Sequence, residues 1–510
     1  MKSFRITTSS HGFKVDGICD SRATEAIHEF LRSLLQYGLI KVGRHFVRKP
    51  VKTFAASNAS RNYYRFHIND LKAFLSHMAE YGFKENNYTI INTPLYEPRY
   101  VELPLKPKWK ARENQITAID YVADETNGPA CKLIPAQPGF GKGLISMMGI
   151  SAVGVFAIYL LRPMYMDKWR EELEDTYDID PSEIITIQGN GELKKMLDQQ
   201  KKKEFFGKVV VISNKTYQAW LSKYEKLGHK KFLKLYPCTP ENFFEFMKAG
   251  FRLIDEGHQD FHLNCKIDYY TNVPNSITLT ATLITKDPFL RKRMDVHYPK
   301  DRQCKVEQIN KYIDSSAYFY QFKHPEKIRT TEFGSPNYSH LAFEASILQK
   351  PQIRDNYFEM IKLLVDVDFF KIKEEGEKFV VFCSKIDFSR ELCAYLRKVY
   401  PSVDIRTYVE DDPYENLIDP VGRVTTYGSA GTAQDIPMLR TNINTIAMDS
   451  LAGNIQILGR TRVMKSGNTP RYVYLVAENI DKHITYHNGR KTMLEERARS
   501  FRVRWHDKPI

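Results

Sequence analysis

The stretch ACKLIPAQPGFGKGLISMMGISAVGVFAIYLL, residues 130–161, decides the fold of this 510-residue chain. A strand pattern at 130–135 enters a glycine-rich turn, a helix pattern begins at residue 144, and an apolar run follows at 153–161. A strand, a tight turn, a helix and a second buried strand produce this pattern. Such units repeat in parallel sheets, so the stretch predicts an α/β fold.

Residues 143–161 form a run of nineteen positions without a charged side chain. A run of this length passes a crude window for a membrane-spanning helix. Lys142 precedes the run, however, and Gly149 and Gly154 interrupt it. Because a buried helix followed by a central strand gives the same hydropathy, we expect no membrane association.

The alternation of strand and helix patterns continues along the chain in two series. The first series predicts strands at 130–135, 153–161, 184–187, 209–213, 251–255 and 276–280. The second predicts strands at 379–383, 403–408, 423–426, 445–448 and 472–477, and it has no glycine-rich loop. Each series is typical of an open parallel sheet.

Five parts are expected from these patterns and from shifts in composition. Residues 1–105 read as a small basic α+β domain, and the proline-containing stretch 94–110 reads as a linker to the next domain. The two parallel-sheet domains are expected at 111–290 and 346–485, with an irregular connection at 291–345 and a basic C-terminal tail at 486–510.

Positive charge is concentrated at the two ends of the chain. The net charge is +14 and the pI is about 9.1. Residues 1–110 carry 18 Lys and Arg against 9 Asp and Glu, and residues 481–510 carry 8 against 4. Basic ends that flank a nearly neutral middle favour a polyanionic partner such as nucleic acid.

The basic domain offers two kinds of candidate for contact with nucleic acid. Arg44, Arg48 and Lys49 lie in an expected basic strand pair, where they could neutralise phosphates. Tyr63 and Tyr64 lie in a stretch that interleaves aromatic and basic groups, and they could stack on bases. Alternation along a half-buried strand explains these two tyrosines equally well.

The cysteines and the first residues of the chain indicate the cellular compartment in which we expect the protein. The chain has seven cysteines and no CxxC pair, which disfavours a zinc site and a disulfide framework. This usage fits a reducing cytosol. Since Met1-Lys2-Ser3-Phe4-Arg5 lacks an apolar leader, we expect no secretory signal and a cytoplasmic location.

The glycine-rich turn has the residues of a phosphate-binding loop. Its glycines permit the backbone angles that aim N–H groups at one point, and Lys142 can reach the β- and γ-phosphates. Two positions depart from the usual pattern: Ala136 replaces the first glycine, and Gly143 replaces the Ser or Thr that contacts Mg²⁺. The residues expected at the nucleotide are Gln137, Pro138, Gly139, Phe140, Gly141, Lys142 and Gly143.

Two carboxylates end the apolar strand pattern at 251–255. Asp255 and Glu256 would emerge at the carboxyl end of that strand, where open parallel sheets bind ligands. Asp255 is expected to hold Mg²⁺ through water, and Glu256 to orient or deprotonate an attacking water. His258 is expected to couple this pair to other elements.

The order of motifs from residue 111 to about 480 resembles that of superfamily 2 helicases of the DEAD/DEAH-box type. The matching segments in the first half are 112–115 (glutamine motif), 136–143 (motif I), 161–163 with Trp169 downstream (motif Ia), 255–258 (motif II) and 280–282 (motif III). Those in the second half are 379–384 (motif IV), 430–437 (motif V) and 456–462 (motif VI). The ordered set implies two tandem RecA-like domains that use ATP and Mg²⁺.

The resemblance assigns roles to residues of the first half. It implies that Gln115 contacts adenine and that Arg162 and Pro163 grip the nucleic-acid backbone. Thr280 and Thr282 would link hydrolysis to movement of the bound strand.

In the second half, the resemblance places Asp435 at the nucleotide and Thr426 at the nucleic acid. Motif VI supplies Gln456, Arg460 and Arg462 as catalytic residues, with its arginines directed at the γ-phosphate. The family spacing puts the second arginine at position 463, which is Val463 here, so Arg462 lies one place early.

The compact length and the small basic N-terminal domain resemble phage helicases of the UvsW type. This resemblance implies a monomeric ATP-dependent helicase that unwinds or branch-migrates forks, four-way junctions or R-loops in recombination, replication or repair. DNA would be the partner, with RNA in R-loops, and the host cytosol the location if a phage encodes the chain. Two alternatives stay open: a viral-type RNA helicase or transcript-release factor, and a nucleic-acid-binding module with weak or lost ATPase.

Overall fold

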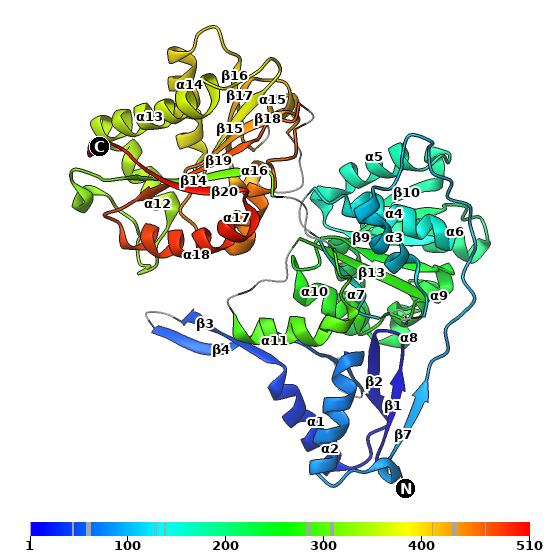
Figure 1. Cartoon of the computed structure of the whole chain (residues 1–510). Helices are drawn as coiled ribbons and strands as arrows, with labels where there is room; N and C mark the ends of the chain where they lie inside the picture. The colour runs from blue at the N-terminus through cyan, green and yellow to red at the C-terminus, as the bar shows by residue number, and fades with distance from the viewer. Residues whose placement is uncertain are drawn as a thin grey trace. The chain divides into compact units, whose positions relative to one another are not determined.

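The computed structural model describes residues 2–42, 45–57, 63–126, 128, 130–136, 139–281, 285, 287–306, 311–410, 412–430, 436–464 and 466–510. The chain forms two compact units, Met1–Glu307 and Gln308–Ile510. Unit 1 contains a mixed sheet and a parallel sheet, and unit 2 contains a second parallel sheet. The fold is therefore α/β with two parallel-sheet domains after a small α+β domain, as the sequence predicts (Figure 1).

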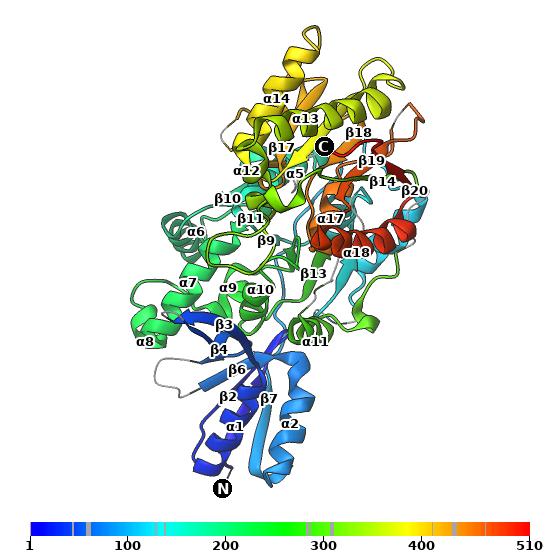
Figure 2. The ribbon, with the colours of Figure 1, turned by 90° about the vertical axis from the view of Figure 1, so that its left-hand side faces the viewer.

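The N-terminal domain is built on a five-stranded sheet of order β5-β6-β2-β1-β7. Strand β1 pairs antiparallel with β2 and parallel with β7, so the sheet is mixed. Helices α1 and α2 pack against each other beside this sheet (Figure 2). The bounds are β1 Phe4–Thr8, β2 Gly12–Asp16, α1 Ser21–Ser33, β5 Ala56–Ser57, β6 Tyr63–His67, α2 Leu71–Glu80 and β7 Tyr88–Asn92.

A separate two-stranded hairpin interrupts this domain. Strand β3, Leu35–Val42, pairs antiparallel with β4, His45–Thr53, and neither strand joins the five-stranded sheet. Figure 1 shows the hairpin as an arm that extends away from α1. Such an isolated hairpin is marginal by itself, and its base is held by bonds from Gln36 to Asp287 and from His262 to the carbonyl of Thr53.

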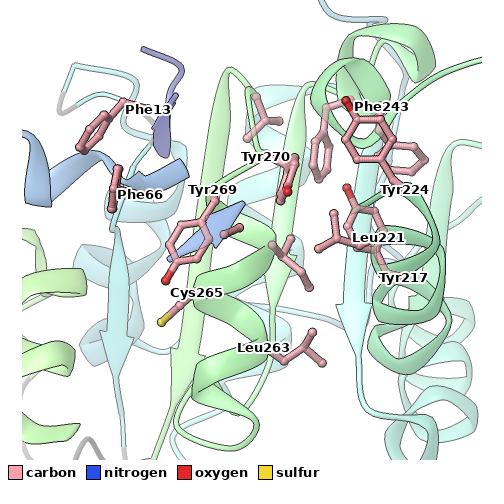
Figure 3. Close-up of a cluster of buried hydrophobic side chains, with 14 of the residues drawn as sticks. Phe13, Phe66, Tyr217, Leu221, Tyr224, Phe243, Leu263, Cys265, Tyr269 and Tyr270 are labelled. Carbon is pink, nitrogen blue, oxygen red and sulfur yellow. The ribbon is translucent and has the colours of Figure 1, made fainter. Parts of the chain in front are cut away.

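The N-terminal domain shares a hydrophobic core with the parallel-sheet domain of unit 1. One cluster of buried side chains runs from Phe13 and Phe66 to Tyr269 and Tyr270 (Figure 3). Gly12 touches the backbone of Tyr269 so closely that an added Cβ would lie 2.8 Å from its Cα. The two domains are therefore joined through a shared hydrophobic core.

Strand β6 belongs to this core, which corrects one expectation from the sequence. Tyr63 and Tyr64 are only 8% and 2% exposed, and the Tyr64 hydroxyl meets His28 Nε2 at 2.8 Å. Both rings are covered because the sheet lies between its helices and the neighbouring domain. They are core residues, as the strand alternation allowed, and are not available to stack on bases.

The parallel sheet of unit 1 has the strand order β10-β11-β9-β12-β13-β8. All five strand pairs are parallel, as the sequence predicts. Its strands are β8 Leu133–Pro135, β9 Ala157–Leu161, β10 Ile184–Ile187, β11 Val209–Ser213, β12 Phe251–Ile254 and β13 Asn275–Thr280. Its helices are α3 Ile116–Ala123, α4 Lys142–Val153, α5 Met166–Thr176, α6 Asn190–Lys202, α7 Asn214–Leu227, α8 His229–Phe232, α9 Phe243–Met247, α10 Phe261–Asp268 and α11 Pro288–His297.

The uncharged run at 143–161 divides between α4 and β9, as expected. Strand β9 lies between β11 and β12 in the middle of the sheet, and all five of its residues are buried. Central strands of parallel sheets are covered on both faces, which explains their continuous apolar sequence. No helix among the described residues is long and apolar enough to cross a membrane.

The parallel sheet of unit 2 has seven strands in the order β16-β17-β15-β18-β19-β14-β20. Its strands are β14 Asp314–Tyr320, β15 Lys378–Cys383, β16 Ile405–Tyr408, β17 Gly422–Thr426, β18 Leu439–Asn444, β19 Arg471–Ala477 and β20 Ser500–Trp505. Its helices are α12 His340–Leu348, α13 Pro351–Val365, α14 Ile386–Val399, α15 Glu415–Ile418, α16 Tyr427–Ala430, α17 Leu451–Leu458 and α18 Asp481–Arg497.

Two expected boundaries are wrong because they leave out strands of this sheet. The supposed irregular connection at 291–345 contains β14, which lies between β19 and β20. The supposed basic tail at 486–510 contains the end of α18 and the edge strand β20. Arginines at alternate positions hid this strand, and one of them, Arg504, is paired with the carboxylate of Asp368.

A third expectation, a strand at 445–448, is shifted: the strand is β18, which ends at Asn444. Its polar residues obscure the strand pattern, and two of them are hydrogen-bonded within the core. Thr441 Oγ1 donates to the carbonyl of Asp368 at 2.6 Å, and Asn444 Nδ2 donates to the Tyr472 hydroxyl at 3.0 Å. Buried polar groups are tolerated when such bonds satisfy them.

Candidate nucleotide-binding site

The glycine-rich loop lies between β8 and α4, at the carboxyl edge of the sheet of unit 1. Gly139 and Gly141 have φ angles of 86° and 87°, which favour glycine over residues with a side chain. Lys142 then begins α4, so the N–H groups of the first helical turn have no partner within the helix. This arrangement can bind phosphate oxygens. Gln137 and Pro138 lie outside the described residues.

Lys142 is directed back along its own loop. Its Nζ donates to the carbonyl oxygen of Ala136 at 2.9 Å. Its positive charge also acts on the acidic pair, since it opposes the rise in the pKa of Asp255 and contributes to the low pKa of His258. Lys142 is therefore bonded to its own loop and also lies close enough to the carboxylates after β12 to act on their charge.

Gln115 braces the loop from the preceding helical turn. It is 1% exposed, and its Nε2 donates to the carbonyl oxygen of Phe140 at 2.6 Å. Its Oε1 accepts from the backbone N–H of Arg112, whose guanidinium also donates to the Phe140 carbonyl at 2.6 Å. The structure thus joins Gln115 to motif I, while a contact with adenine stays a prediction.

Asp255 and Glu256 follow the last residue of β12, at the same edge of the sheet as the loop. Asp255 Oδ2 accepts a 2.8 Å bond from Trp169 Nε1, and its Oδ1 accepts from the backbone N–H of Glu256. Burial and the neighbouring Glu256 raise the pKa of Asp255 to about 6. The carboxylate is therefore costly to ionise here unless a cation joins it.

Glu256 is held in an uncommon conformation. Its φ angle is 49°, in the left-handed region that a non-glycine residue rarely adopts. Its Oε2 is buried 3.2 Å from His258 Nδ1 and accepts no hydrogen bond from any residue that the structure describes. Strained backbone and an unsatisfied carboxylate oxygen together are typical of a functional position.

His258 joins this pair to the next strand. Its Nδ1 lies 2.7 Å from Thr280 Oγ1 at the end of β13, so motifs II and III are in contact, while their role in coupling stays a prediction. Burial, with Lys142 nearby, lowers the pKa of His258 to about 4, so the imidazole is neutral at pH 7. Thr282 lies outside the described residues.

Arg162 and Pro163 follow β9, beside the acidic pair. The Arg162 guanidinium donates to Gln259 Oε1 and pairs with Asp260 Oδ2 at 3.1 Å. Both partners lie directly after motif II, so side-chain contacts of Arg162 join motif Ia to motif II. Pro163 is partly exposed.

The sequence missed several residues that shape the site. A cavity of about 720 Å³ lies against the loop, and Trp109 and Met147, which belong to none of the motifs, are among the residues that line it. Trp169, which sequence reasoning noted only beside motif Ia, forms part of the acidic site through its bond to Asp255. An aromatic residue in a linker or on a helix carries no specific signal, so the fold was needed to place both tryptophans.

Motifs V and VI belong to unit 2. Asp435 lies outside the described residues. Gln456 Oε1 accepts a 2.6 Å bond from the Tyr427 hydroxyl. Arg460 is buried, whereas Val463 is exposed. Position 463 is where the family pattern has its second arginine.

The residues expected at the nucleic acid differ in exposure. Arg48 and Lys49 are exposed on β4, and the Arg48 guanidinium lies 5.3 Å from the centre of the Tyr37 ring. Thr426 is buried and its hydroxyl meets Ser429 Oγ at 2.9 Å, so it is engaged within unit 2. Arg44 lies outside the described residues.

The donor set at the strand ends fits Mg²⁺. Among the described residues, no group of three or more His, Cys, Asp and Glu side chains forms a complete metal cage. Mg²⁺ does not need one, because it commonly takes one or two carboxylates and completes its shell with phosphate and water. Asp255 is a suitable oxygen donor, and the unsatisfied Oε2 of Glu256 is suited to accept a hydrogen bond from a water molecule beside the metal.

No protein-family model matches the chain, and no curated protein does. Solved structures do. S. cerevisiae Dbp5 bound to RNA and ADP BeF3 is 12% identical, with 78% of this chain and 90% of that chain covered and a TM-score of 0.49. A Dbp5 variant from S. cerevisiae, bound to a Gle1 variant and IP6, is 14% identical, with 78% and 89% covered and a TM-score of 0.48. T4 UvsW is 12% identical over 99% of both chains, with a TM-score of 0.33.

Proposed function

We propose that this chain is an ATP-driven helicase or translocase of superfamily 2. One observation carries the proposal: the phosphate loop with Lys142 and the acidic pair Asp255-Glu256 lie at the same edge of one parallel sheet. Lys142 acts electrostatically on Asp255, and His258 joins the pair to Thr280. A phosphate site, a water-activating carboxylate and a link to the next strand are the parts of a nucleotide-driven motor.

In this proposal the triphosphate lies on the N-terminus of α4, where Lys142 would exchange its bond to Ala136 for the β- and γ-phosphates. The cavity beside the loop would take the nucleoside, with Trp109 and Gln115 among its lining residues. Asp255 would hold Mg²⁺, which supplies charge neutralisation on the phosphates when bound.

Glu256 is proposed as the base. It would orient a water molecule at the γ-phosphorus and accept its proton as the bond from that phosphorus to the bridging oxygen breaks and ADP leaves. Lys142 and the N–H groups of the loop would stabilise the charge that develops on the phosphate oxygens. Arg460 and Arg462 of motif VI are also proposed to act on the developing charge of the γ-phosphate.

The nucleic acid is proposed to be branched DNA, with RNA in R-loops. The exposed Arg48 and Lys49 of the hairpin, with Arg162 and Pro163 of motif Ia, would contact its backbone. The chain would act as a monomer in a cytoplasm, the host cytosol if a phage encodes it. RNA duplex unwinding is the alternative that a substrate panel would reveal.

Hydrolysis with and without nucleic acid tests this proposal. We expect the wild-type chain to hydrolyse ATP faster when forks, four-way junctions or R-loops are added, and to separate their strands. Lys142→Ala should abolish hydrolysis and leave DNA binding intact, because the lysine meets phosphate of the nucleotide. The exposed Lys201 of α6 offers a matched control, Lys201→Ala, that should hydrolyse normally.

No hydrolysis by the wild type, or hydrolysis that no nucleic acid changes, would contradict the motor function and favour a binding module. Stimulation by RNA duplexes alone would replace DNA by RNA as the substrate. A Lys142→Ala variant that loses DNA binding would remove the proposed role of this lysine.

A further inference from the structure

Gly143 leaves space that a carboxylate fills. In a phosphate loop of the usual kind, the residue after the lysine has a hydroxyl that contacts Mg²⁺. A Cβ added to Gly143 would lie 2.9 Å from Glu172 Oε2 and 3.6 Å from the ring of Trp169. An acidic oxygen therefore lies close to where a serine or threonine hydroxyl would project.

The backbone does not explain the glycine at this position. Gly143 is the second residue of α4 and, unlike Gly139 and Gly141, does not have a left-handed φ angle. Glycine inside a helix is less stable than alanine, because it loses more conformational freedom on folding. Space for Glu172 gives a reason for tolerating that cost, because any side chain at 143 would have to displace its carboxylate.

Helix α5 places Glu172 at this point together with Trp169. The two residues are three positions apart, so they lie on the same face of the helix. Trp169 contacts Asp255 through Nε1, and the opposite edge of its ring faces Gly143. Glu172 is half-buried, and its other oxygen, Oε1, lies 3.5 Å from Lys168 Nζ.

We infer that Glu172 supplies, from α5, the oxygen ligand that motif I lacks at position 143, acting on the nucleotide-bound Mg²⁺ or on one of its waters. This inference rests on the proposed function. A carboxylate oxygen suits Mg²⁺, which accepts one or two carboxylates beside phosphate and water. Gly143 and Glu172 together would then replace the usual hydroxyl, and Trp169 would keep Asp255 and Glu172 in fixed positions.

Mn²⁺ binding in the presence of ADP, followed by electron paramagnetic resonance, tests this role without turnover. We expect Glu172→Gln to raise the Mn²⁺ concentration for half-saturation by about tenfold or more, as loss of a supporting ligand does. Binding of a fluorescent ADP analogue without metal should not change. Glu174→Gln, on the same helix but paired with Arg170, is the matched control and should bind Mn²⁺ normally.

A second pair of variants excludes a general structural effect. Glu172→Ala should weaken Mn²⁺ binding, and adding Gly143→Ser to it should restore most of the affinity, because the hydroxyl returns to a position that is now empty. Equal Mn²⁺ affinity of Glu172→Gln and wild type would overturn the inference and leave the proposed function standing. So would a double variant that folds but is not rescued, whereas a wild type that binds no nucleotide would overturn both.

Discussion

At the scale of single residues, the site is organised around Trp169. Its indole N–H is bonded to Asp255, and its ring lies against the phosphate loop at Gly143. Asp255 is partly buried and difficult to ionise, with a pKa raised to about 6, so a neutral donor on its Oδ2 helps to keep the carboxylate in place. A bond to a charged group of this kind contributes about 1.5–3 kcal/mol.

Trp169→Phe tests this view because phenylalanine keeps the packing and removes the N–H. We expect kcat for ATP hydrolysis to fall about ten- to a hundredfold, because Asp255 is no longer held in its orientation. The change in KM for ATP should be smaller, because the residues that contact the nucleotide are unchanged. The measurement is steady-state hydrolysis at saturating DNA and Mg²⁺.

Trp505→Phe is a suitable control, because Trp505 is exposed on β20 in unit 2. A Trp169→Phe variant with wild-type kcat would show that the bond to Asp255 has no catalytic consequence. A large drop in the melting temperature of the Trp169→Phe variant would instead show that the tryptophan mainly stabilises the core.

Single residues also show where sequence reasoning reaches its limit. The positions of the glycine-rich loop and of the acidic pair at the ends of β8 and β12 were predictable, since both need particular residue types at strand ends. Glu172 and Trp169 were not, because their positions depend on how α5 packs against α4 and β12. Tyr63 and Tyr64 were ambiguous for a related reason: alternation alone does not show which face of a strand another domain covers.

At the scale of elements, the hairpin β3–β4 is the part of the N-terminal domain with the clearest surface role. It carries Arg48 and Lys49 in exposed positions, and Leu39 beside them is 71% exposed. An exposed two-stranded arm with basic residues can track a phosphate backbone. The rest of the domain is committed to the core that it shares with the parallel sheet.

The double variant Arg48→Glu with Lys49→Glu tests the hairpin as a DNA contact. If both side chains neutralise phosphates of a duplex, the slope of log Kd against log salt should fall by about two. ATP hydrolysis without DNA should not change. Fluorescence anisotropy of a labelled fork over a range of salt concentrations measures the slope.

Lys201→Glu with Lys202→Glu makes the same charge change at the exposed end of α6 and serves as the control. If both double variants lower the slope equally, the effect is one of overall charge, and the hairpin has no specific role. An unchanged slope in the hairpin variant would exclude Arg48 and Lys49 as phosphate contacts.

Elements of unit 2 were harder to predict than those of unit 1. Strands β9 and β11 have continuous apolar sequences, and the strands of this sheet alternate with helices, so their places along the chain could be predicted. Strand β18 hides Thr441 and Asn444 in the core through hydrogen bonds, and β20 alternates arginines with apolar residues at the sheet edge. Patterns of hydropathy miss strands whose polar groups are satisfied by tertiary contacts.

At the scale of the whole molecule, the chain consists of two units with separate hydrophobic cores. The core of unit 1 joins the N-terminal domain to the first parallel sheet, and the cores of unit 2 lie within its own sheet. Charged contacts reinforce the junction in unit 1: Arg293 and Asp70 form a buried bidentate pair at 2.8 and 2.6 Å, and Arg65 pairs with Glu241. The domains on either side of the predicted boundary near residue 105 therefore share one core, and we expect them to unfold together.

Removal of residues 1–105 should consequently destabilise unit 1 and leave unit 2 unaffected. Truncation exposes the apolar face around Tyr269 and leaves the buried charge of Arg293 without Asp70, a loss that typically costs several kcal/mol. It also removes Arg65 from the partly exposed Glu241. Calorimetry of the intact chain should show two transitions, one for each unit, and truncation should lower the temperature of only one. A fragment of residues 311–510 assigns the other transition to unit 2, and it should melt cooperatively at an unchanged temperature. Equal stability of the truncated and intact chains would show that the N-terminal domain is an independent attachment, and that the shared core contributes nothing to the folding of unit 1.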